Sequence, residues 1–587
     1  MKRTKIVATL GPATDSVEKM KALIESGMNA ARVNFSHGTY DSHTVLINNL
    51  KKAREELNAP IPLILDTKGP EIRIKRFKNN KKIYLEPGSR FTLTTEDIEG
   101  DETRVAVTYS NLPSDLNKNS RVLIDDGLVE LKVVALSDTD IDCEVVNGGF
   151  ISSNKGVNIP DVYVNLPALT ERDIEDIKFG IKMGFDYIAA SFIRSASDVL
   201  KIRRVLEENG GAGINIISKI ENRQGVRNID EILSVSDGIM VARGDLGVEI
   251  PLQEVPLVQK DLIKKASAAC KPVITATQML ESMVSNPRPT RAEVNDVANA
   301  IFDGSDAIML SGETAQGKYS VEAVATMATI AETTEGNINY IKRLHLQFAP
   351  EQVNNTTNAV SYAACTAAAE LKTSCIATIT KTGFTARTIA KYKPACPIAA
   401  SSCDERVWRQ LNLVWGCQPV LSKAIEDESK LFELAVDTAV KAGLAVKGDT
   451  IVIAVGVPVG VSGSTNTLRV ETVGDVLCKG IGTGLKKASG TARIVNYKKE
   501  AERNFRTGEI LVTSDTTNEL IPFVKQASAI VVGPVESPEN CHAGIVGHAL
   551  DIPVVMCQEK VTDLIKDGTM ITVDAEKGFV YLGTPKE

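Results

Sequence analysis

The stretch Ile214-Asn215-Ile216-Ile217-Ser218-Lys219-Ile220-Glu221-Asn222 runs from a short apolar segment into charged and amide side chains. Its apolar part, residues 214–220, has the length and the β-branched composition of a buried strand. A helical pattern follows, and the next apolar run, residues 238–242, also leads into charge at Arg243 and Asp245. Buried strands that alternate with helices are typical of a parallel sheet built from βαβ units.

The same alternation continues on both sides of these runs and gives eight strand-like runs in total. They are residues 5–10, 30–35, 61–66, 187–192, 214–220, 238–242, 272–276 and 307–310. Eight such units predict an α/β fold of the TIM (β/α)8 barrel type, in which the carboxyl ends of the strands meet on one face that carries the chemistry. The residues expected on that face are Gly11, Asn34, Ser36, Asp66, Lys68, Ser191, Arg194, Glu221, Asp245, Thr277, Ser311 and Glu313.

About 120 residues separate the third run from the fourth, which is too long for a structureless loop in a compact domain. Short β-rich segments separated by turn residues lie in this gap, at residues 82–85, 90–94, 104–108, 121–124 and 128–134. We therefore predict a small inserted β-barrel that closes over the active face as a lid and brings Arg73 and Lys155 to it.

Composition limits the classes of partner. The chain has 587 residues, of which 43% are apolar and 24% charged, as in ordinary globular proteins, and this length predicts about four domains. A formal charge of −7 argues against binding to nucleic acid or to an anionic membrane. No run approaches the roughly 20 apolar residues of a membrane-spanning helix, and no secretion signal is visible. The ten cysteines stand singly, so we expect buried, reduced thiols and a cytoplasmic location.

Lys219, Glu221 and Asp245 form the densest concentration of charge at the expected strand ends. Two carboxylates about 4 Å apart repel each other by about 4 kcal/mol at an effective dielectric constant of about 20, and a divalent cation would turn this repulsion into binding. Oxygen ligands favour Mg²⁺ or Mn²⁺ over zinc, and two carboxylates leave coordination positions for water and substrate. The alternative interpretation is a surface ion-pair network of the same three side chains.

A second group of side chains offers neutral oxygens and one carboxylate, a set suited to a monovalent cation. Its members are Asn34, Ser36, Asp66 and Thr67, and Arg32 and Arg73 add anion-binding forks beside them. In the alternative interpretation, the residues after the second strand only close a turn, in which Ser36 and His37 cap the next helix.

Six motifs occur together and in order, and they carry a family resemblance. They are N-F-S-H-G (34–38), D-T-K-G-P-E-I-R (66–73), K-I-E-N (219–222), A-R-G-D (242–245), I-T-A-T-Q-M-L (274–280) and M-L-S-G-E-T-A (309–315). By these motifs, residues 1 to about 475 resemble pyruvate kinase. The resemblance implies transfer of the phosphoryl group of phosphoenolpyruvate to ADP, a homotetramer, a catalytic TIM barrel (1–69 and 164–345), an inserted β-barrel lid domain (70–163) and a regulatory α/β open-sheet domain (346–474).

Matching positions imply roles for individual residues. Glu221 and Asp245 resemble the Mg²⁺ ligands, and Lys219 resembles the group that stabilises the phosphoryl group in transfer. Asn34, Ser36, Asp66 and Thr67 resemble the K⁺ site, and Glu71 accompanies K⁺ dependence in this family. Arg32 is similar to the residue that binds the substrate phosphate. The region that binds the carboxylate and transfers the proton is resembled by Gly244, Asp245 and Thr277. Nucleotide contacts are resembled by Asn34, His37, Arg73 and Lys155. Asn154 and Ser320 depart from the residues usual in the family.

A loop in the α/β domain is a candidate anion site. A strand at residues 375–380 leads into Lys381-Thr382-Gly383-Phe384-Thr385 and a helix from about residue 386 to 391. Hydroxyls and glycine at a helix amino terminus favour anion binding. By resemblance, this loop would bind the phosphate of a small-molecule effector through Thr380, Lys381, Thr382, Gly383 and Thr385, and residues 456–467 would form a second loop over the phosphate. In the alternative interpretation, these residues only cap the helix.

Residues 475–587 extend beyond the end of many pyruvate kinases. Strand-like segments occur at residues 509–513, 529–533, 552–556 and 570–573. Asn540-Cys541-His542-Ala543-Gly544-Ile545-Val546 resembles the phosphohistidine motif of swivelling domains in phosphoenolpyruvate-using enzymes, so we expect an extra β-rich domain of that type. Because Asn540 and Gly544 depart from the motif and no second nucleotide-binding domain is present, we favour a structural or regulatory role for His542 over a catalytic one.

Two other functions fit part of the pattern. A barrel carbon–carbon lyase would use Glu221, Asp245 and Mg²⁺ to hold an enolate, but it would need neither the lid nor Arg73. A metabolite sensor without catalysis would not need the set formed by Lys219, Glu221, Asp245 and Thr277.

Overall fold

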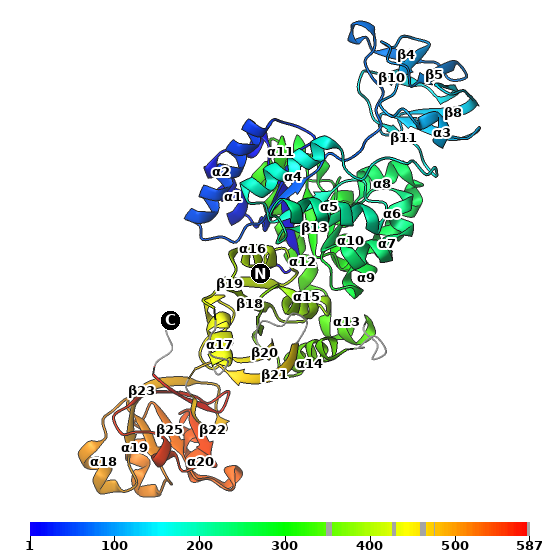
Figure 1. Ribbon diagram of the computed structural model, residues 1–587. Coiled ribbons are helices and arrows are strands. Elements are labelled where there is room, and N and C mark those ends of the chain that lie inside the picture. Colours follow the sequence, from blue (N-terminus) through cyan, green and yellow to red (C-terminus); the bar gives the residue numbers. More distant parts are fainter. Residues whose placement is uncertain (348–354, 425–429, 458–464, 475, 584–587) are drawn as a thin grey trace.

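A computed structural model describes residues 1–347, 355–424, 430–457, 465–474 and 476–583. Figure 1 shows four units that follow one another along an extended molecule, with the inserted segment at one end and the C-terminal segment at the other. Their sheets are a closed eight-stranded barrel, the sheets of the insertion, a five-stranded sheet and a second closed barrel.

The first barrel confirms the predicted TIM fold. Its strands follow the order β1-β16-β15-β14-β13-β12-β3-β2, and every neighbouring pair is parallel. Their bounds are β1 Lys5–Thr9, β2 Ala30–Asn34, β3 Leu63–Asp66, β12 Tyr187–Ala190, β13 Asn215–Ile220, β14 Gly238–Ala242, β15 Val273–Ala276 and β16 Ala307–Leu310. The predicted runs agree with these strands to within two residues at either end, because apolar side chains continue briefly into the adjoining loops.

Helices surround this barrel, and their amphipathic faces cover the outer side of the strands. They include α1 Val17–Glu25, α2 Tyr40–Glu56, α4 Glu171–Met183, α5 Ala196–Glu208, α7 Ile229–Val235, α9 Val255–Ala268, α10 Arg291–Asp303 and α12 Ser320–Gly336. The outer core joins strand residues such as Ile6 to helix residues such as Leu23. A separate inner core holds Ile64, Met240 and Met309, as expected for a barrel filled with side chains.

The insertion consists of two sheets. One has the order β11-β7-β8-β9-β5-β6, and a two-stranded sheet pairs β10 with β4. The bounds are β4 Ile83–Leu85, β5 Arg90–Thr94, β6 Arg104–Ala106, β7 Arg121–Ile124, β8 Val129–Leu136, β9 Asp140–Asn147, β10 Gly149–Ile151 and β11 Val157–Asn158. The five predicted segments appear as β4 to β8, and the sheets share one apolar core.

The α/β domain has a five-stranded sheet in the order β19-β18-β17-β20-β21. The strands are β17 Ile376–Ile379, β18 Ile398–Ser402, β19 Cys417–Leu421, β20 Thr450–Gly456 and β21 Thr465–Thr472, and only the pairing of β20 with β21 is antiparallel. Its helices are α13 Tyr340–Gln347, α14 Thr356–Glu370, α15 Phe384–Lys391, α16 Glu405–Leu411 and α17 Leu431–Lys441.

This domain closes the amino-terminal end of the TIM barrel. Leu413 has no exposed surface and belongs to the inner barrel core. Around it, Tyr187 donates to the Gln410 carbonyl over 2.9 Å, and the Arg409 guanidinium lies 3.0 Å from an Asp186 carboxylate oxygen. Apolar packing and buried polar pairs therefore fix the domain to the barrel bottom.

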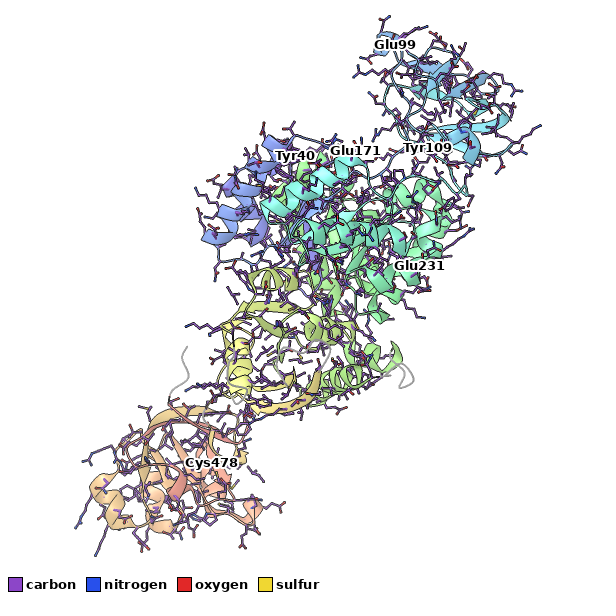
Figure 2. All side chains as sticks on the ribbon, in the orientation of Figure 1. Tyr40, Glu99, Tyr109, Glu171, Glu231 and Cys478 are labelled. Atoms are coloured by element: carbon purple, nitrogen blue, oxygen red, sulfur yellow. The ribbon has the colours of Figure 1, made fainter. Side chains whose placement is uncertain are left out.

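The C-terminal unit is a closed barrel in the order β22-β26-β25-β24-β23-β27-β28. Its strands are β22 Val476–Thr483, β23 Lys487–Ile494, β24 Ile510–Thr513, β25 Ala529–Val532, β26 Val554–Cys557, β27 Met570–Asp574 and β28 Phe579–Leu582; its helices are α18 Lys498–Asn504, α19 Ile521–Val524, α20 His542–Leu550 and α21 Val561–Leu564. The four predicted strands appear as β24 to β27. Figure 2 labels Cys478, which lies within this barrel.

The cysteine prediction needs one correction, because Cys403 is exposed and Cys270 is only partly buried, whereas the other eight are buried. All ten are free thiols. Within the described residues, no helix is long and apolar enough to cross a membrane.

We predict that Lys393→Met destabilises the junction between the TIM barrel and the α/β domain. Lys393 forms a buried ion pair with Asp306, and its removal leaves a buried carboxylate without its charge partner, which costs about 3–5 kcal/mol. Urea unfolding followed by tryptophan fluorescence measures the loss, because Lys393 Nζ lies 4.8 Å from the ring centre of Trp415. Lys21→Met breaks an exposed pair with Glu56 and should cost far less stability, because solvent screens exposed ion pairs. Equal losses in the two variants would contradict the prediction.

Candidate active site

A buried charge cluster lies at the carboxyl ends of four neighbouring barrel strands. The ammonium of Lys219, at the end of β13, donates to Asp66 Oδ1 over 3.0 Å and to Ser191 Oγ over 2.7 Å. It also lies 2.9 Å from Glu221 Oε1. Lys219 is 8% exposed, Asp66 1% and Glu221 0%, so these three charges lie in the interior, whereas Asp245 is only partly buried.

Burial and neighbouring charges shift the titration of this cluster. Burial raises the pKa of Glu221 to about 7, and Asp245 adds to the rise while Lys219 opposes it. Burial acts to lower the pKa of Lys219, but Asp66 and Glu221 outweigh it and raise that pKa above its ordinary value. The pKa of Asp66 is lowered because Arg32 and Lys219 outweigh the effect of its own burial. Lys219 and Asp66 are therefore charged at neutral pH.

One oxygen of Glu221 is available for a further ligand. Glu221 Oε2 accepts the backbone N–H of Phe192 over 2.5 Å. Glu221 Oε1 accepts no well-directed hydrogen bond, although Lys219 Nζ is close. A fully buried carboxylate oxygen without a hydrogen bond is costly unless another positive group joins it, so this donor set fits a divalent cation.

Asp245 lies in the first turn of α8 (Arg243–Glu249), directly after β14. Beside it, the Gly244 N–H donates to Thr277 Oγ1 over 2.8 Å, and Arg243 donates to the Thr277 carbonyl over 2.6 Å. Thr277 has φ +68°, which is unfavourable for a β-branched residue and requires such surrounding contacts. The structure thus brings Gly244 and Thr277 together, as the motifs predicted.

The predicted anion and monovalent-cation residues come from β2 and β3. Arg32 Nε donates to Asp66 Oδ2 over 2.6 Å, and the guanidinium also donates to Thr9 over 3.0 Å. Asn34 lies opposite Asp66 in the register of the two strands. The Asn34 side chain accepts the Ser36 N–H over 3.0 Å, and Thr67 Oγ1 accepts the Ser191 N–H over 3.1 Å.

His37 follows directly, and it is exposed on the turn between β2 and α2. Glu71 is occupied by an ion pair with Arg73, and the Arg73 Nε lies 2.7 Å from its carboxylate.

A cleft of about 580 Å³ separates the insertion from the barrel face. Arg73 and Lys155 line it together with Asp245, so the structure gathers these predicted residues around one space. The insertion stands away from the barrel in Figure 1, and Lys155 pairs within the insertion with Asp125 at 2.8 Å.

Sequence reasoning missed the acidic turn that faces this cleft. Asp125 and Asp126 join β7 to β8 with φ +56° and +55° and line the cleft opposite the barrel. Burial raises the pKa of Asp126, and Asp245 and Asp125 add to the rise. The sequence Asp125-Asp126-Gly127 indicates a turn, and only the fold places it near Asp245.

The candidate effector loop lies at the carboxyl end of β17. The Thr380 N–H donates to the Ser401 carbonyl over 2.9 Å, and Gly383 has φ +77° at the start of α15. Thr385 Oγ1 lies 2.9 Å from Thr465 Oγ1, which connects the helix to β21. Lys381 and Thr382 are exposed or partly exposed on this turn. The predicted second loop lies largely outside the described residues, at 458–464.

Both ring nitrogens of His542 have partners. Nδ1 lies 2.9 Å from Thr516 Oγ1, and Nε2 lies 3.2 Å from Asn518 Oδ1. An amide oxygen only accepts, so the assigned neutral tautomer carries its proton on Nε2 and accepts from Thr516. These partners orient the imidazole, which lines an open pocket together with Asp515 and Asn540.

Within the described residues, no group of three or more His, Cys, Asp or Glu side chains could hold a metal ion. A divalent ion at this face would therefore take two carboxylates from the protein and its other ligands from water or substrate.

A TIM barrel with an inserted sheet domain, and with paired cations and carboxylates at the carboxyl ends of its strands, has the arrangement of an α/β-barrel enzyme. Residues 1–324 match the family described as pyruvate kinase, barrel domain, and residues 358–471 match its alpha/beta domain. Residues 505–578 match the mobile domain of PEP-utilising enzymes. The chain belongs to the pyruvate kinase family and is a phosphotransferase.

Curated relatives agree over the whole chain. A pyruvate kinase of Sporosarcina psychrophila is 46% identical over 585 residues, and one of Bacillus licheniformis is 48% identical over 586 residues; each comparison covers 99% of both chains. A pyruvate kinase of Clostridium acetobutylicum is 52% identical over 474 residues, which are 81% of this chain and 100% of that relative. A solved pyruvate kinase structure from Cryptosporidium parvum has a TM-score of 0.77 at 38% identity and covers 80% of this chain and 96% of its own. The family implies a divalent metal and K⁺ in general.

We predict that binding of a divalent cation weakens as the pH falls below about 7. The pKa of Glu221 is raised to about 7, so below that pH a growing fraction of this carboxyl is protonated, neutral and unable to bind the ion. Each further pH unit below the pKa lowers the ionised fraction of Glu221 about tenfold, and the affinity for the divalent cation should fall in proportion. Titration with Mn²⁺, followed by electron paramagnetic resonance at about pH 6, 7 and 8, measures this.

The matched control is Glu221→Gln, which lacks the titrating group and should bind weakly without this pH dependence. Equal affinity of the unaltered chain at the lowest and highest pH would contradict the prediction.

Proposed function

We propose that this chain is a pyruvate kinase that transfers the phosphoryl group of phosphoenolpyruvate to ADP and gives pyruvate and ATP in glycolysis. The observation that carries the proposal is the buried ammonium of Lys219, held beside a Glu221 oxygen without a hydrogen bond, at the barrel face that opens on the cleft. Phosphoryl transfer needs little covalent help from the protein, so positioned positive charge supplies most of the catalysis.

Each charged residue has a proposed part in this reaction. Glu221 and Asp245 hold Mg²⁺ or Mn²⁺, which when bound neutralises charge on the transferring group. Lys219 stabilises the phosphoryl group from the side of β13. Arg32 grips the substrate phosphate, and its pairing with Asp66 fixes the guanidinium in place.

The remaining site residues bind the substrate, the nucleotide and the monovalent ion. Gly244, Asp245 and Thr277 bind the carboxylate end of phosphoenolpyruvate, and the Thr277 hydroxyl positions the proton donor for the enolate, because a threonine hydroxyl is itself a weak acid. Nucleotide contacts come from Asn34, His37, Arg73 and Lys155, and K⁺ binds at Asn34, Ser36, Asp66 and Thr67. Support comes from the register that places Asn34 beside Asp66, and from the cleft that Arg73, Lys155 and Asp245 line.

The insertion, which comprises residues 70–163, acts as the lid of the barrel. The cleft separates Arg73 and Lys155 from the charge cluster, so closing it would exclude water and bring both side chains toward the substrate. The proposed domains are the catalytic barrel (1–69 and 164–345), the lid (70–163), the α/β domain (346–474) and the C-terminal domain (475–587).

We predict that Lys219→Met lowers turnover by at least about 10² to 10³, since a preorganised electrostatic partner of the transition state is removed. Purified protein is mixed with phosphoenolpyruvate, ADP, Mg²⁺ and K⁺, and pyruvate formation is followed. Lys265→Met, which breaks an exposed pair with Asp230, should keep full activity. Absence of turnover in the unaltered chain would favour a lyase or a sensor, and full turnover in Lys219→Met would remove the proposed role of this lysine.

A phosphorylated small molecule is proposed to bind at Thr380, Lys381, Thr382, Gly383 and Thr385 and to regulate turnover. Support comes from the left-handed Gly383 and from the hydroxyl contact between Thr385 and Thr465 at the amino end of α15. A homotetramer and a cytoplasmic location are proposed from family resemblance alone, and sedimentation velocity would establish the subunit count.

We predict that Thr382→Glu raises the effector concentration needed for half-maximal response at least about tenfold, because a carboxylate then repels the phosphate. The response is measured by titration with phosphorylated sugars and nucleoside monophosphates in the pyruvate assay. Thr329→Glu, on the exposed side of α12, adds the same charge elsewhere and should leave the response unchanged. An identical response in both variants would contradict an effector site at this loop.

A further inference from the structure

Ser191 contacts the proposed catalytic lysine although no motif assigns it a role. It follows β12 directly, between β3 and β13 in the barrel, and it is 4% exposed. Its hydroxyl oxygen lies 2.7 Å from Lys219 Nζ and 2.6 Å from the Thr67 carbonyl oxygen.

The direction of these two hydrogen bonds is fixed by chemistry. A serine hydroxyl has one proton and two acceptor lone pairs, whereas a carbonyl oxygen can only accept. The Thr67 carbonyl at 2.6 Å is a closer acceptor for the Ser191 proton than Asp66 Oδ1 at 3.4 Å, so the proton goes to the carbonyl and the lone pairs face the ammonium of Lys219. The Ser191 N–H donates in turn to Thr67 Oγ1 over 3.1 Å, so two reciprocal bonds lock Ser191 to Thr67.

The next residue extends the same turn to the other side of the lysine. Phe192 has φ +55°, a left-handed conformation that is rare for a bulky residue. This conformation directs its N–H to Glu221 Oε2 over 2.5 Å. Ser191 thus orients Lys219 through its hydroxyl, and Phe192 orients Glu221 through its backbone N–H. These contacts hold the strained backbone of Phe192 in place.

A neutral acceptor has a different effect on Lys219 from a carboxylate. Asp66 and Glu221 attract the ammonium, but they also cancel its positive charge. The Ser191 hydroxyl directs the N–H group without adding negative charge. Asp66 and Ser191 each accept from the ammonium, and Glu221 Oε1 lies 2.9 Å from it, so the Ser191 hydroxyl is the neutral member of the three oxygens around Lys219 Nζ.

We propose that Ser191 is a positioning residue, which holds the Lys219 ammonium aimed at the transferring phosphoryl group through its fixed hydrogen bond to the Thr67 carbonyl. This inference rests on the proposed phosphoryl-transfer function. Without the hydroxyl, the flexible lysine side chain keeps its two carboxylate partners but loses the third acceptor that fixes the direction of its N–H groups, and the charge is then less firmly placed for the reaction.

The test compares Ser191→Ala and Ser191→Cys with Ser218→Ala. Cysteine fills the volume of serine but is a weak acceptor, so it separates loss of the hydrogen bond from loss of packing. Ser218 is the matched control, because its hydroxyl is equally buried and pairs with Ser236 at 2.7 Å instead of with Lys219. Turnover and the KM for phosphoenolpyruvate are measured for each full-length variant.

We expect both Ser191 variants to lose about 10- to 100-fold in kcat, the effect of one hydrogen bond to a charged group, with KM changed less than about threefold. Ser218→Ala should keep kcat within about threefold. Unchanged kcat in Ser191→Cys, or an equal loss in Ser218→Ala, would overturn the inference.

A second measurement does not depend on activity. In a crystal structure of Ser191→Ala, we expect Lys219 Nζ to leave its present position and move away from the site of the lost hydroxyl, while it stays in contact with Asp66 and Glu221. An unmoved Nζ would overturn the positioning role even if the chain turned over no phosphoenolpyruvate. Absence of turnover in the unaltered chain together with a displaced Nζ would instead refute the proposed function and support the positioning role.

Discussion

The structure depends on keeping the Lys219 ammonium and its carboxylate partners together in the barrel interior. Removing each ion from water costs several kcal/mol, which is recovered only if the partners stay in place. Four consecutive barrel strands contribute one group each, in the order β13, β12, β3 and β2: Lys219, Ser191, Asp66 and Arg32. A slip in the register of β2, β3 or β13 would separate a buried charge from a partner. The parallel pairings of the barrel and the charge cluster therefore support each other.

The two adjoining domains act on opposite ends of this barrel. At the amino-terminal end, Leu413 fills the opening, and polar pairs around it hold the α/β domain against the strands. At the carboxyl end, the insertion leaves a cleft lined by charged groups of both signs. Leu413 of the α/β domain belongs to the core of the barrel, whereas the insertion has an apolar core of its own. Relative movement is therefore expected between the insertion and the barrel.

The sequence predicted the parts of the site that depend on strand order alone. Lys219, Asp66 and Asp245 follow apolar runs, and the closure of eight parallel strands brings such ends together whatever the loops do. The roles of Ser191 and Asp126 were not predicted, because they depend on the direction of a hydroxyl and on where an inserted domain places a turn. Neither is encoded in periodicity. Several strands were also missed, namely β9 to β11 of the insertion, β18 to β21 of the α/β domain, and β22, β23 and β28. Polar or glycine-rich stretches such as residues 476–494 become strands through their pairing in the closed barrel and not through local propensity.

The C-terminal barrel reaches the rest of the enzyme through a small contact. The Clostridium acetobutylicum relative aligns over its whole length with only 81% of this chain, so a pyruvate kinase can consist of the preceding domains. Here the Lys577 ammonium lies 2.9 Å from an Asp449 carboxylate oxygen and donates to the Gly448 carbonyl over 2.8 Å. Asp449 immediately precedes β20, and the other end of that buried strand is Gly456, where the proposed second effector loop begins. The charge cluster contains no residue from the C-terminal barrel. The strand β20 joins the contact at Asp449 to the start of the proposed second effector loop, so it offers a path by which that barrel can influence the α/β domain.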